Sequence, residues 1–183
     1  MNQRVFVHRV DRDGCILDVS PAWQAFAEEN GAGPALSVVQ GAVLWNYIAG
    51  AQTRHLYHVL MERAQQSGGS LHIPYRCDSP DTRRFMEMEL EFLPEKGVFE
   101  FRNRLLRSEP REPVPLLDPN TCRSEAILRM CSWCKKVKIH DDEWVEVEDA
   151  VRRLGLLEEE CMPRLSHGIC PDCEARFRNG EPR

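Results

Sequence analysis

Two pairs of cysteines constrain this 183-residue chain more than any other feature of its sequence. The first pair is Cys131 and Cys134, the second is Cys170 and Cys173, and two residues separate the members of each pair. Two thiolates at this spacing can bind one metal ion from a single tight turn, and two such turns supply the four ligands of a closed structural zinc site. The sequence therefore predicts a structural Zn²⁺ bound by Cys131, Cys134, Cys170 and Cys173.

Two alternatives to a four-sulfur site stay open. His167 lies three residues before Cys170 and could replace one sulfur, which would give a site of three cysteines and one histidine. The pairs could also form a redox dithiol, although a redox C-x2-C motif is expected within a βαβ unit. Two matched pairs favour a metal. The 35 residues between the pairs exceed the gap of the commonest zinc ribbons, so we expect secondary structure there.

The composition is that of a folded protein without a large net charge of either sign. The formal net charge is −5 and the sequence pI is about 5.7, so no long-range attraction to nucleic acid or to an anionic membrane is expected. Neither a signal-peptide-like stretch nor an apolar run of membrane-spanning length occurs. We therefore expect a cytoplasmic protein, whose eight cysteines are thiols or metal ligands. The cysteines outside the two pairs are Cys15, Cys77, Cys122 and Cys161.

The first hundred residues alternate between strand and helix signals. Ser20 followed by Pro21 predicts a helix start, because serine caps the free amides and proline loses no hydrogen bond at the first position. Pro74 indicates an edge strand or a bulge. Alternation of apolar residues with glutamates over residues 86–92 predicts a strand with one solvated face. The expected elements are a hairpin over 4–20, helices over 21–30, 43–48 and 52–66, a strand over 71–77, and a hairpin of 86–92 with 98–106.

Four prolines between Ser108 and Asn120 predict a stiff, extended linker. We therefore expect a first domain over residues 1–107, a linker over 108–121 and a zinc-binding module over 122–183. The module has little apolar mass, so a bound metal should supply folding free energy directly. Its expected elements are a helix over 124–130, strands over 135–140 and 144–147, and a helix over 148–154 that ends at Gly155.

Several phrases resemble a bacterial PAS-like sensory family. In the first domain they are Asp13-Gly14 with Ile16, Ser20 to Trp23, and Pro74 to Pro80 with Arg83 and Arg84. In the tail, Cys131 to Lys136, Trp144 and Ser166 to Cys173 resemble the short zinc-binding segment of many bacterial PAS sensor proteins. The resemblance implies an α+β fold, with a five-stranded antiparallel sheet flanked by helices and often a small-molecule pocket, and a sensory or protein-interaction role.

The expected function is accordingly binding, with a signalling protein partner and a pocket ligand that the sequence does not identify. No catalysis is expected, because a closed metal site has no open position for substrate, and neither a kinase signature nor a phosphate-binding loop is present. The alternative is a redox switch, in which oxidation of either cysteine pair ejects zinc. Nucleic-acid binding is disfavoured, since residues 122–183 carry 11 Lys+Arg against 13 Asp+Glu. The candidate basic patch comprises Arg123, Arg129, Lys135, Lys136 and Lys138.

Three further groups of residues are candidate sites. His55 and His58 lie on one side of a helix, where a haem-binding protein could present an axial ligand, but we expect exposed helix residues. Cys77 beside an arginine could be a reactive thiol, but we expect a small buried residue. Arg76, Arg83 and Arg84 could hold an anion, but we expect them to form local ion pairs. No Asn-Cys-Arg phrase of a photoactive flavin site is present.

Overall fold

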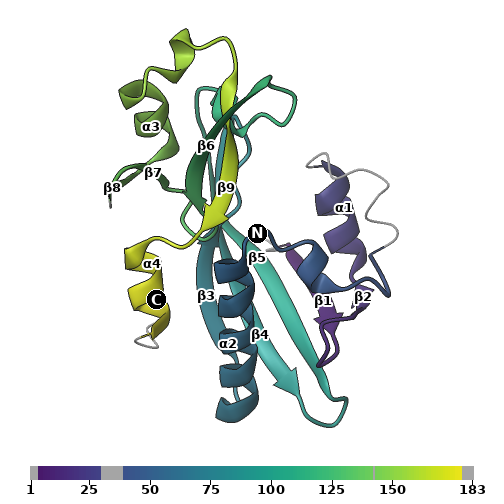
Figure 1. The fold of residues 1–183 in the computed structure, drawn as a ribbon. Coiled ribbons are helices and arrows are strands. Elements are labelled where there is room, and N and C mark those ends of the chain that lie inside the picture. Colours follow the sequence, from purple (N-terminus) through teal and green to yellow (C-terminus); the bar gives the residue numbers. More distant parts are fainter. Residues whose placement is uncertain (1–3, 30–38, 142, 179–183) are drawn as a thin grey trace.

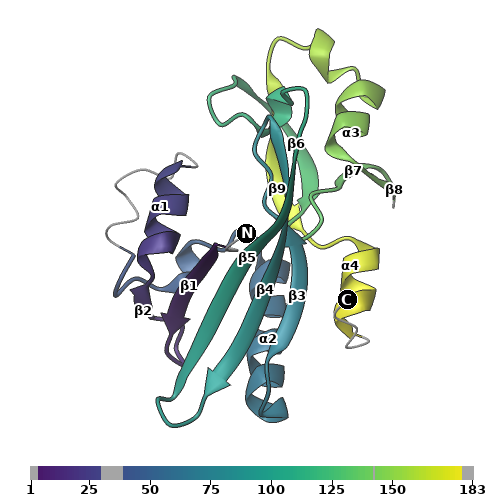
Figure 2. The ribbon, with the colours of Figure 1, turned by 180° about the vertical axis from the view of Figure 1, so that it is seen from behind.

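The computed structural model of the chain describes residues 4–29, 39–141 and 143–178. Two sheets follow one another along the chain, and the C-terminal sheet lies above the N-terminal one in Figure 1. Figure 2 shows the same end-to-end arrangement from behind. Among the described residues, none of the helices combines the length and the apolar character that crossing a membrane requires.

The N-terminal sheet has five strands and is antiparallel throughout, as expected. Its order is β2-β1-β5-β4-β3, with α2 covering one face over β3 and β4 and α1 packed beside β1 (Figures 1 and 2). The elements are β1 Val5–Val10, β2 Ile16–Val19, α1 Pro21–Glu29, the 3-10 helix η2 Leu44–Asn46, α2 Ala51–Ser67, β3 Leu71–Arg76, β4 Thr82–Leu93 and β5 Val98–Pro110. The expected end of α1, Asn30-Gly31, lies outside the described residues.

Local signals in this half are confirmed. The Ser20 hydroxyl caps α1 by accepting the amide of Trp23 at 3.2 Å, and Pro74 lies on β3, an edge strand. In the β4–β5 hairpin, Glu87 stands opposite Arg104 and forms an ion pair of 3.0 Å with it. The apolar members of β4 face the core instead. Residue alternation therefore located both the strand and its buried face.

The C-terminal sheet has the strand order β8-β7-β6-β9, and β6 pairs with β9 in parallel. Its elements are the 3-10 helix η3 Pro115–Leu117, β6 Arg123–Cys131, β7 Val137–His140, β8 Glu143–Val145, α3 Val147–Arg153, the 3-10 helix η4 Leu156–Glu158, β9 Met162–Gly168 and α4 Pro171–Arg178. Gly155 ends α3 with a positive φ of 64°, as expected. Neither β9 nor α4 was anticipated.

The helix predicted over residues 124–130 is wrong, because these residues form β6. Ser-Glu-Ala-Ile-Leu-Arg-Met contains good helix formers, and intrinsic propensity favours a helix. The segment instead occupies an inner position of the sheet, with β7 on one side and β9 on the other. Pairing with a strand that begins only at Met162 outweighs the local preference, which is worth tenths of a kcal/mol per residue.

The proline-rich segment is not a free linker. Its first three residues, Ser108 to Pro110, belong to β5, and Leu116 is fully buried. Val114 and Leu116 pack with residues of β6, β7, α3 and β9 in one apolar cluster. The division of the chain into two domains stays a prediction, but the segment between them contributes side chains to the second core.

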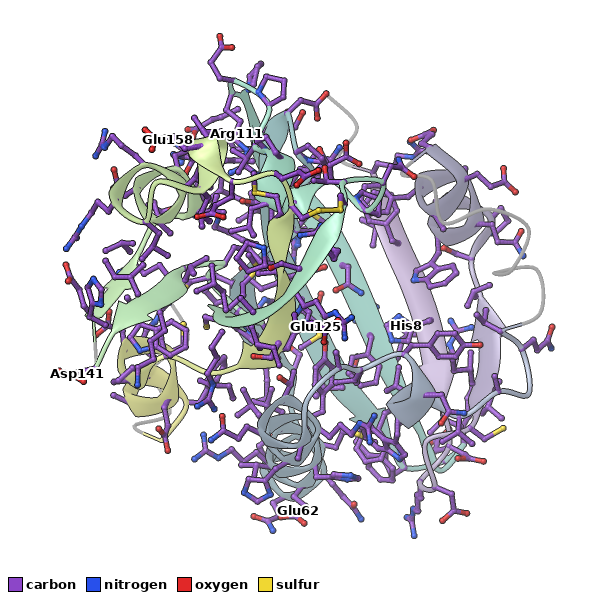
Figure 3. All side chains as sticks on the ribbon, turned by 45° about the horizontal axis from the view of Figure 1, so that its top comes forward. His8, Glu62, Arg111, Glu125, Asp141 and Glu158 are labelled. Atoms are coloured by element: carbon purple, nitrogen blue, oxygen red, sulfur yellow. A yellow bond between two sulfur atoms is a disulfide. The ribbon has the colours of Figure 1, made fainter. Side chains whose placement is uncertain are left out.

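A disulfide joins Cys122 to Cys161, so the expectation of eight reduced cysteines is wrong for this pair (Figure 3). The cause is the parallel pairing of β6 with β9. Arg123 stands opposite Met162, so the two preceding residues are neighbours, with Cα atoms 4.8 Å apart. Disulfides are rare in cytosolic proteins, and the cytoplasmic location stays a prediction.

Candidate metal centre

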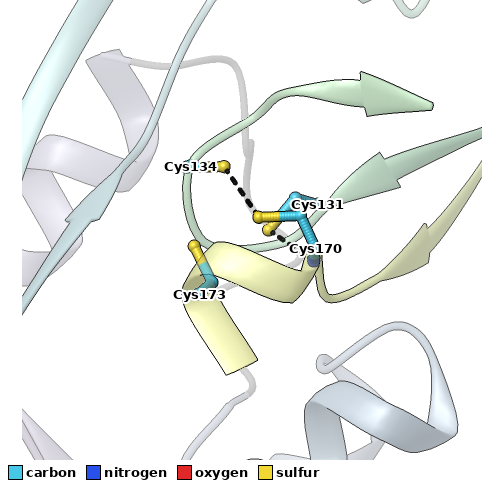
Figure 4. A group of neighbouring side chains, drawn as sticks. All are labelled: Cys131, Cys134, Cys170 and Cys173. Atoms are coloured by element: carbon cyan, nitrogen blue, oxygen red, sulfur yellow. Dashed lines mark hydrogen bonds between the residues drawn. The ribbon is translucent and has the colours of Figure 1, made fainter. Parts of the chain in front are cut away.

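The sulfur atoms of four cysteines gather at the junction of the two sheets. The sulfurs of Cys131, Cys134, Cys170 and Cys173 all lie within 4.8 Å of one another, and those of Cys134 and Cys170 are 3.6 Å apart (Figure 4). A disulfide requires about 2.05 Å, whereas a tetrahedron with Zn–S distances of about 2.3 Å has edges of about 3.8 Å. The spacing is therefore that of a cluster able to bind a metal ion, with one ligand atom from each cysteine.

The first pair lies on a turn that closes on itself. Cys131 is the last residue of β6, its carbonyl accepts the amide of Lys135 at 3.1 Å, and its amide donates to the carbonyl of Lys136 at 2.8 Å. Lys135 adopts a left-handed backbone conformation with φ of 64°, which a non-glycine residue rarely takes. This turn brings the Cys134 sulfur back over Cys131.

The second pair lies at the start of α4. Cys170 immediately precedes the helix and Cys173 is in its first turn. The amide of Cys170 donates to the Cys131 sulfur at 3.5 Å. The two pairs meet because β9 runs parallel to β6 and places Gly168 opposite Cys131. The spacing of the cysteines identified the cluster, but not the parallel strand that assembles it.

Hydrogen bonds among the four thiols lower the pKa of Cys131 and Cys170 and raise the pKa of Cys134 and Cys173, so negative charge is favoured on the first two sulfurs only. Hydrogen bonds from the other three thiols, that of Cys134 first, lower the pKa of Cys131. Lys136 lies 3.5 Å from Asp172 on the outer side. Burial alone would lower the pKa of Lys136, but Asp172, Cys134 and Cys170 raise it overall. A cation beside a metal-bound set of four thiolates would offset its excess negative charge, and Lys136 lies close enough to Cys134 and Cys170 to do so.

The turn between Cys131 and Cys134 packs against the N-terminal sheet. Trp133 is buried, with its ring 5.4 Å from that of Tyr57 on α2 and 4.9 Å from that of Phe177 on α4. Its carbonyl accepts the amide of Arg76, the last residue of β3, at 2.8 Å. Ser132 and Thr53 share a hydroxyl hydrogen bond of 2.8 Å. The cysteine cluster is thus part of the core that α2 and the five-stranded sheet enclose.

A buried ionic network makes a second link between the two sheets. It contains three arginines and three acids, so its formal charges cancel. Asp78 pairs with Arg76 and Arg111, and acidic residues at the start of α3 complete the network. Its remaining ion pairs are Arg76–Glu146 at 2.6 Å, Arg83–Glu148 at 2.8 Å and Arg111–Glu148 at 2.9 Å. Of the three arginines considered as an anion site, Arg76 forms the expected local ion pair with Asp78, Arg83 pairs with the distant Glu148, and Arg84 donates to the Cys77 carbonyl.

His167, the alternative ligand, is not in the cysteine group. It lies on β9 opposite Met130, and its ring lines a neighbouring cavity. Gly50, just before α2, approaches its backbone so closely that a Cβ there would lie 2.6 Å from the His167 carbonyl oxygen. The positive φ of Gly50, 86°, suits glycine as well. This contact brings the start of α2 against β9.

The other candidate residues have structural surroundings. His55 and His58 are exposed, and His58 packs on Trp45 with ring centroids 4.1 Å apart. Cys77 is half-buried, and burial raises the pKa of its thiol, which disfavours a reactive thiolate. Within the proposed basic patch, the Arg123 guanidinium donates to three backbone carbonyls and Arg129 donates to Gln52. These two arginines are engaged within the fold.

Comparison with known proteins adds no family. No family model matches the chain, and no curated protein sequence matches it at a significant level.

Proposed function

We propose that this protein is a PAS-like sensor or adaptor that acts by binding, with a structural zinc ion at the four-cysteine cluster. One observation carries the proposal: the cluster belongs to the same core as the five-stranded sheet and lies where that sheet meets the second one. A metal ion at this place would hold the two sheets in a fixed relative position. In the N-terminal half a hairpin, two short helices, a longer helix and three antiparallel strands follow one another, and this order supports the PAS-like proposal.

Zinc is the proposed metal because of the donor set. Four thiolates at tetrahedral spacing select zinc or an iron–sulfur centre, and paired C-x2-C turns are the usual frame of structural zinc. Cys131 and Cys170 are fully buried and Cys173 nearly so. Four protein ligands leave no open coordination position, so the ion would supply folding free energy and no reaction chemistry.

The proposed output is interaction with a signalling partner in the cytoplasm. A ligand or partner bound to the first sheet would act on the second through two links. These are the turn from Cys131 to Cys134, called the cysteine turn, and the ionic network of Arg76, Asp78 and Arg111. Both links end on β3 or the residues that follow it. The N-terminal sheet is therefore the proposed input region, and the C-terminal sheet the region that receives the signal.

Metal content of the purified, untagged chain tests the proposal. We expect one zinc per chain, and loss of zinc in the Cys170→Ser/Cys173→Ser variant together with the folding of the second sheet. Cys15→Ser is the matched control, because Cys15 lies outside the cluster, and it should retain one zinc. Absence of metal from the wild-type chain, with thiols that readily form a disulfide, would overturn the structural-zinc proposal in favour of the redox switch.

The redox switch has one observation in its favour. Cys134 is half-buried and lines a surface cavity beside β3 and α4, which offers an oxidant a route to this residue. Oxidation of the thiolates would release zinc and loosen the junction. Release of zinc by mild peroxide, reversed by thiol reductant, supports the switch. Retention of the metal under the same treatment supports a purely structural site.

A further inference from the structure

A groove of about 290 Å³ follows the outer edge of β3, between that strand, α2 and α4. In Figures 1 and 2, α4 stands beside β3 on the side away from β4. We infer that the groove binds an extended, acidic segment of a partner protein, which adds a strand to β3 and places apolar side chains in the groove. The inference rests on the proposed binding function and names the chemistry of the partner.

The backbone of β3 directs hydrogen-bonding groups toward this outer edge. The amide of Arg76 donates away from β4, to the Trp133 carbonyl at 2.8 Å, and the amide of the next residue donates to β4 at 3.0 Å. Backbone groups alternate in direction along an antiparallel strand. Those of Pro74 and His72, two and four residues before Arg76, therefore also point away from β4.

The amide and the carbonyl of His72 and the carbonyl of Pro74 are open to a partner; proline has no amide hydrogen to offer. β3 is the last strand of its sheet, and in the part of the chain that the structure describes no strand pairs with its outer side. The Trp133 carbonyl already makes one bond of the kind that an added strand would make. An extended peptide beside it would continue the ladder, which is how peptides bind to exposed sheet edges.

The side chains beside this edge are mainly apolar. Successive side chains of a strand point to opposite faces, so every second side chain of an added strand would enter the groove, against Leu60 of α2, Ile73 of β3 and Phe177 of α4. A volume of about 290 Å³ is at the lower end of the range of small-molecule pockets. The groove therefore suits a few side chains of a peptide better than a whole cofactor.

The charge of the groove is one-sided. Arg63 from α2, Arg76 from β3 and Arg176 from α4 line it, and among the described lining residues none is acidic. This contrasts with the formal charge of −5 of the whole chain. Arg76 is paired with Asp78 and Glu146, so the positive charge of the lining outside that network is on the two helices. Acidic side chains of a partner would complement it, and complementary charge of this kind favours specific association.

The cysteine cluster forms one end of the groove. Cys134 and Cys173 are part of its lining, and Cys173 lies in the first turn of α4, the helix that supplies Arg176 and Phe177. A zinc ion bound as proposed would hold this helix beside β3. We therefore expect peptide binding to require the metal-loaded chain.

Peptide selection on the metal-loaded full chain tests the inference. A displayed library of short random peptides is bound to the immobilised protein, and enriched sequences are synthesised for titration. They should contain apolar residues at alternate positions together with Asp or Glu. Replacing those acidic residues by Asn or Gln should weaken binding roughly tenfold, because charge pairs with Arg63 and Arg176 are lost.

Hydrogen exchange and N-methylation locate the bound peptide. The His72 amide should exchange more slowly in the complex, whereas the Ile73 amide, which faces β4, is the internal reference and should change little. Methylation of the peptide nitrogens that donate to the His72 and Pro74 carbonyls should weaken binding roughly fivefold each, since one hydrogen bond is lost. Methylation of the alternate nitrogens should have little effect.

A charge reversal in the groove has a matched control. Arg176→Glu changes an exposed residue of α4 that lines the groove, and it should weaken binding of the selected peptide roughly tenfold. Arg152→Glu makes the same change of charge at an exposed residue of α3 outside the lining, and this variant should bind the peptide as the wild type does.

Each result decides the inference. No enriched peptide, enriched peptides without acidic residues, unchanged exchange of the His72 amide in the complex, or equal binding by Arg176→Glu and Arg152→Glu would overturn it. Protection of the His72 amide that rises with protein concentration in the absence of peptide would also overturn it, because the occupant would then be a second copy. Zinc content measured on the same samples separates the two proposals: one zinc per chain without peptide binding refutes the partner chemistry alone, whereas a metal-free, folded chain refutes the structural-zinc proposal.

Discussion

The two sheets of this protein are stabilised in different ways. The N-terminal sheet has a continuous apolar core in which Leu90 and Phe101 are fully buried. The C-terminal sheet has a smaller core of mainly aliphatic side chains, a disulfide between the starts of two strands and the four-cysteine cluster at one end. Small units with little apolar burial commonly need such covalent or metal constraints. We therefore expect the stability of the first sheet to depend mainly on packing and that of the second to depend on the disulfide and on the proposed metal.

The two cores also exchange residues across the boundary expected from the sequence. Trp133 and the cysteines follow the proline-rich segment but pack in the core of the first sheet. Val114 and Leu116 lie within that segment but pack in the core of the second. Order along the chain therefore does not separate the two cores, and perturbing either one should be felt at the junction.

Removal of the proposed zinc ion should have the largest effect. Structural zinc supplies on the order of 10 kcal/mol of apparent binding free energy in small domains at pH 7. Treatment with EDTA should unfold the C-terminal sheet and expose Trp133, seen as lost ¹H–¹⁵N signals for β6 to α4 and a red shift of tryptophan fluorescence. Signals of β1 and β2, far from the cluster, should persist. An unchanged spectrum after complete metal removal would show that the C-terminal sheet folds without a bound metal.

Loss of the disulfide should have the next largest effect. Cys122 and Cys161 are 39 residues apart, and the chain-entropy model gives about 4 kcal/mol for closing a loop of this length. Denaturant unfolding of Cys122→Ser/Cys161→Ser should show this loss in the C-terminal transition, with the N-terminal sheet less affected. Cys15→Ser is the control. A free energy of unfolding equal to that of the wild type would show that the bond does not constrain the second sheet.

Shortening a side chain of the supposed linker should cost somewhat less. Leu116→Ala removes a fully buried side chain, and such changes lower the free energy of unfolding by about 3 kcal/mol. Leu157→Ala in the same half is the matched control, because Leu157 is 68% exposed, and its effect should be near zero. If the two variants are equally stable, Leu116 does not stabilise the second core and the proline-rich segment acts only as a spacer.

Acid should weaken the first sheet through His8. The ring is stacked on Phe101 at 4.7 Å, its Nδ1 has no hydrogen-bond partner, and burial lowers the pKa of His8 from 6.5 to about 4. The unfolded state therefore binds a proton more readily than the folded state does. The free energy of unfolding is highest above pH 6.5, where His8 is neutral in both states, and it decreases as the pH falls from 6.5 toward 4. The loss should be about 2 kcal/mol by pH 5. His8→Phe leaves the four-cysteine cluster unchanged and should not show this pH-dependent loss of unfolding free energy. The same pH dependence in both proteins would refute the role of His8.

The smallest effect is expected on the charged face of the β4–β5 hairpin. Arg104→Ala breaks the partly exposed pair with Glu87, and cross-strand pairs of this kind contribute tenths of a kcal/mol. The change should also diminish in high salt. A loss above 1 kcal/mol in thermal unfolding would show that this face does more than keep the sheet solvated.

The sequence was most informative where structure is local. Alternation along β4, the cap at Ser20 and the stop at Gly155 each depend on neighbours within a few residues, and all three are confirmed. The cluster of four cysteines was equally readable, because two residues between thiols is a geometric requirement of the chemistry. Its metal and its function stay proposals.

Errors arose where a distant partner decides the structure. Residues 124–130 have helical propensity, yet β9, which starts at Met162, makes them a strand. The same parallel pairing sets Cys122 beside Cys161, and no spacing rule could indicate that bond. The cavity of about 270 Å³ between α2, β3 and the turn from Cys131 to Cys134 also has no local signal in the sequence, since its lining extends from Tyr47 to His167.

The hydrogen bond from the Arg76 amide to the Trp133 carbonyl has a consequence for solubility. β3 is an edge strand, and an open edge can pair with another molecule and begin aggregation. Pro74 removes one donor from the strand, and the cysteine turn covers its end. With zinc bound at the cluster as proposed, a chain that lacks the ion would leave that end uncovered and Trp133 exposed. The supply of metal during synthesis would then determine how much of the protein folds and how much of it aggregates.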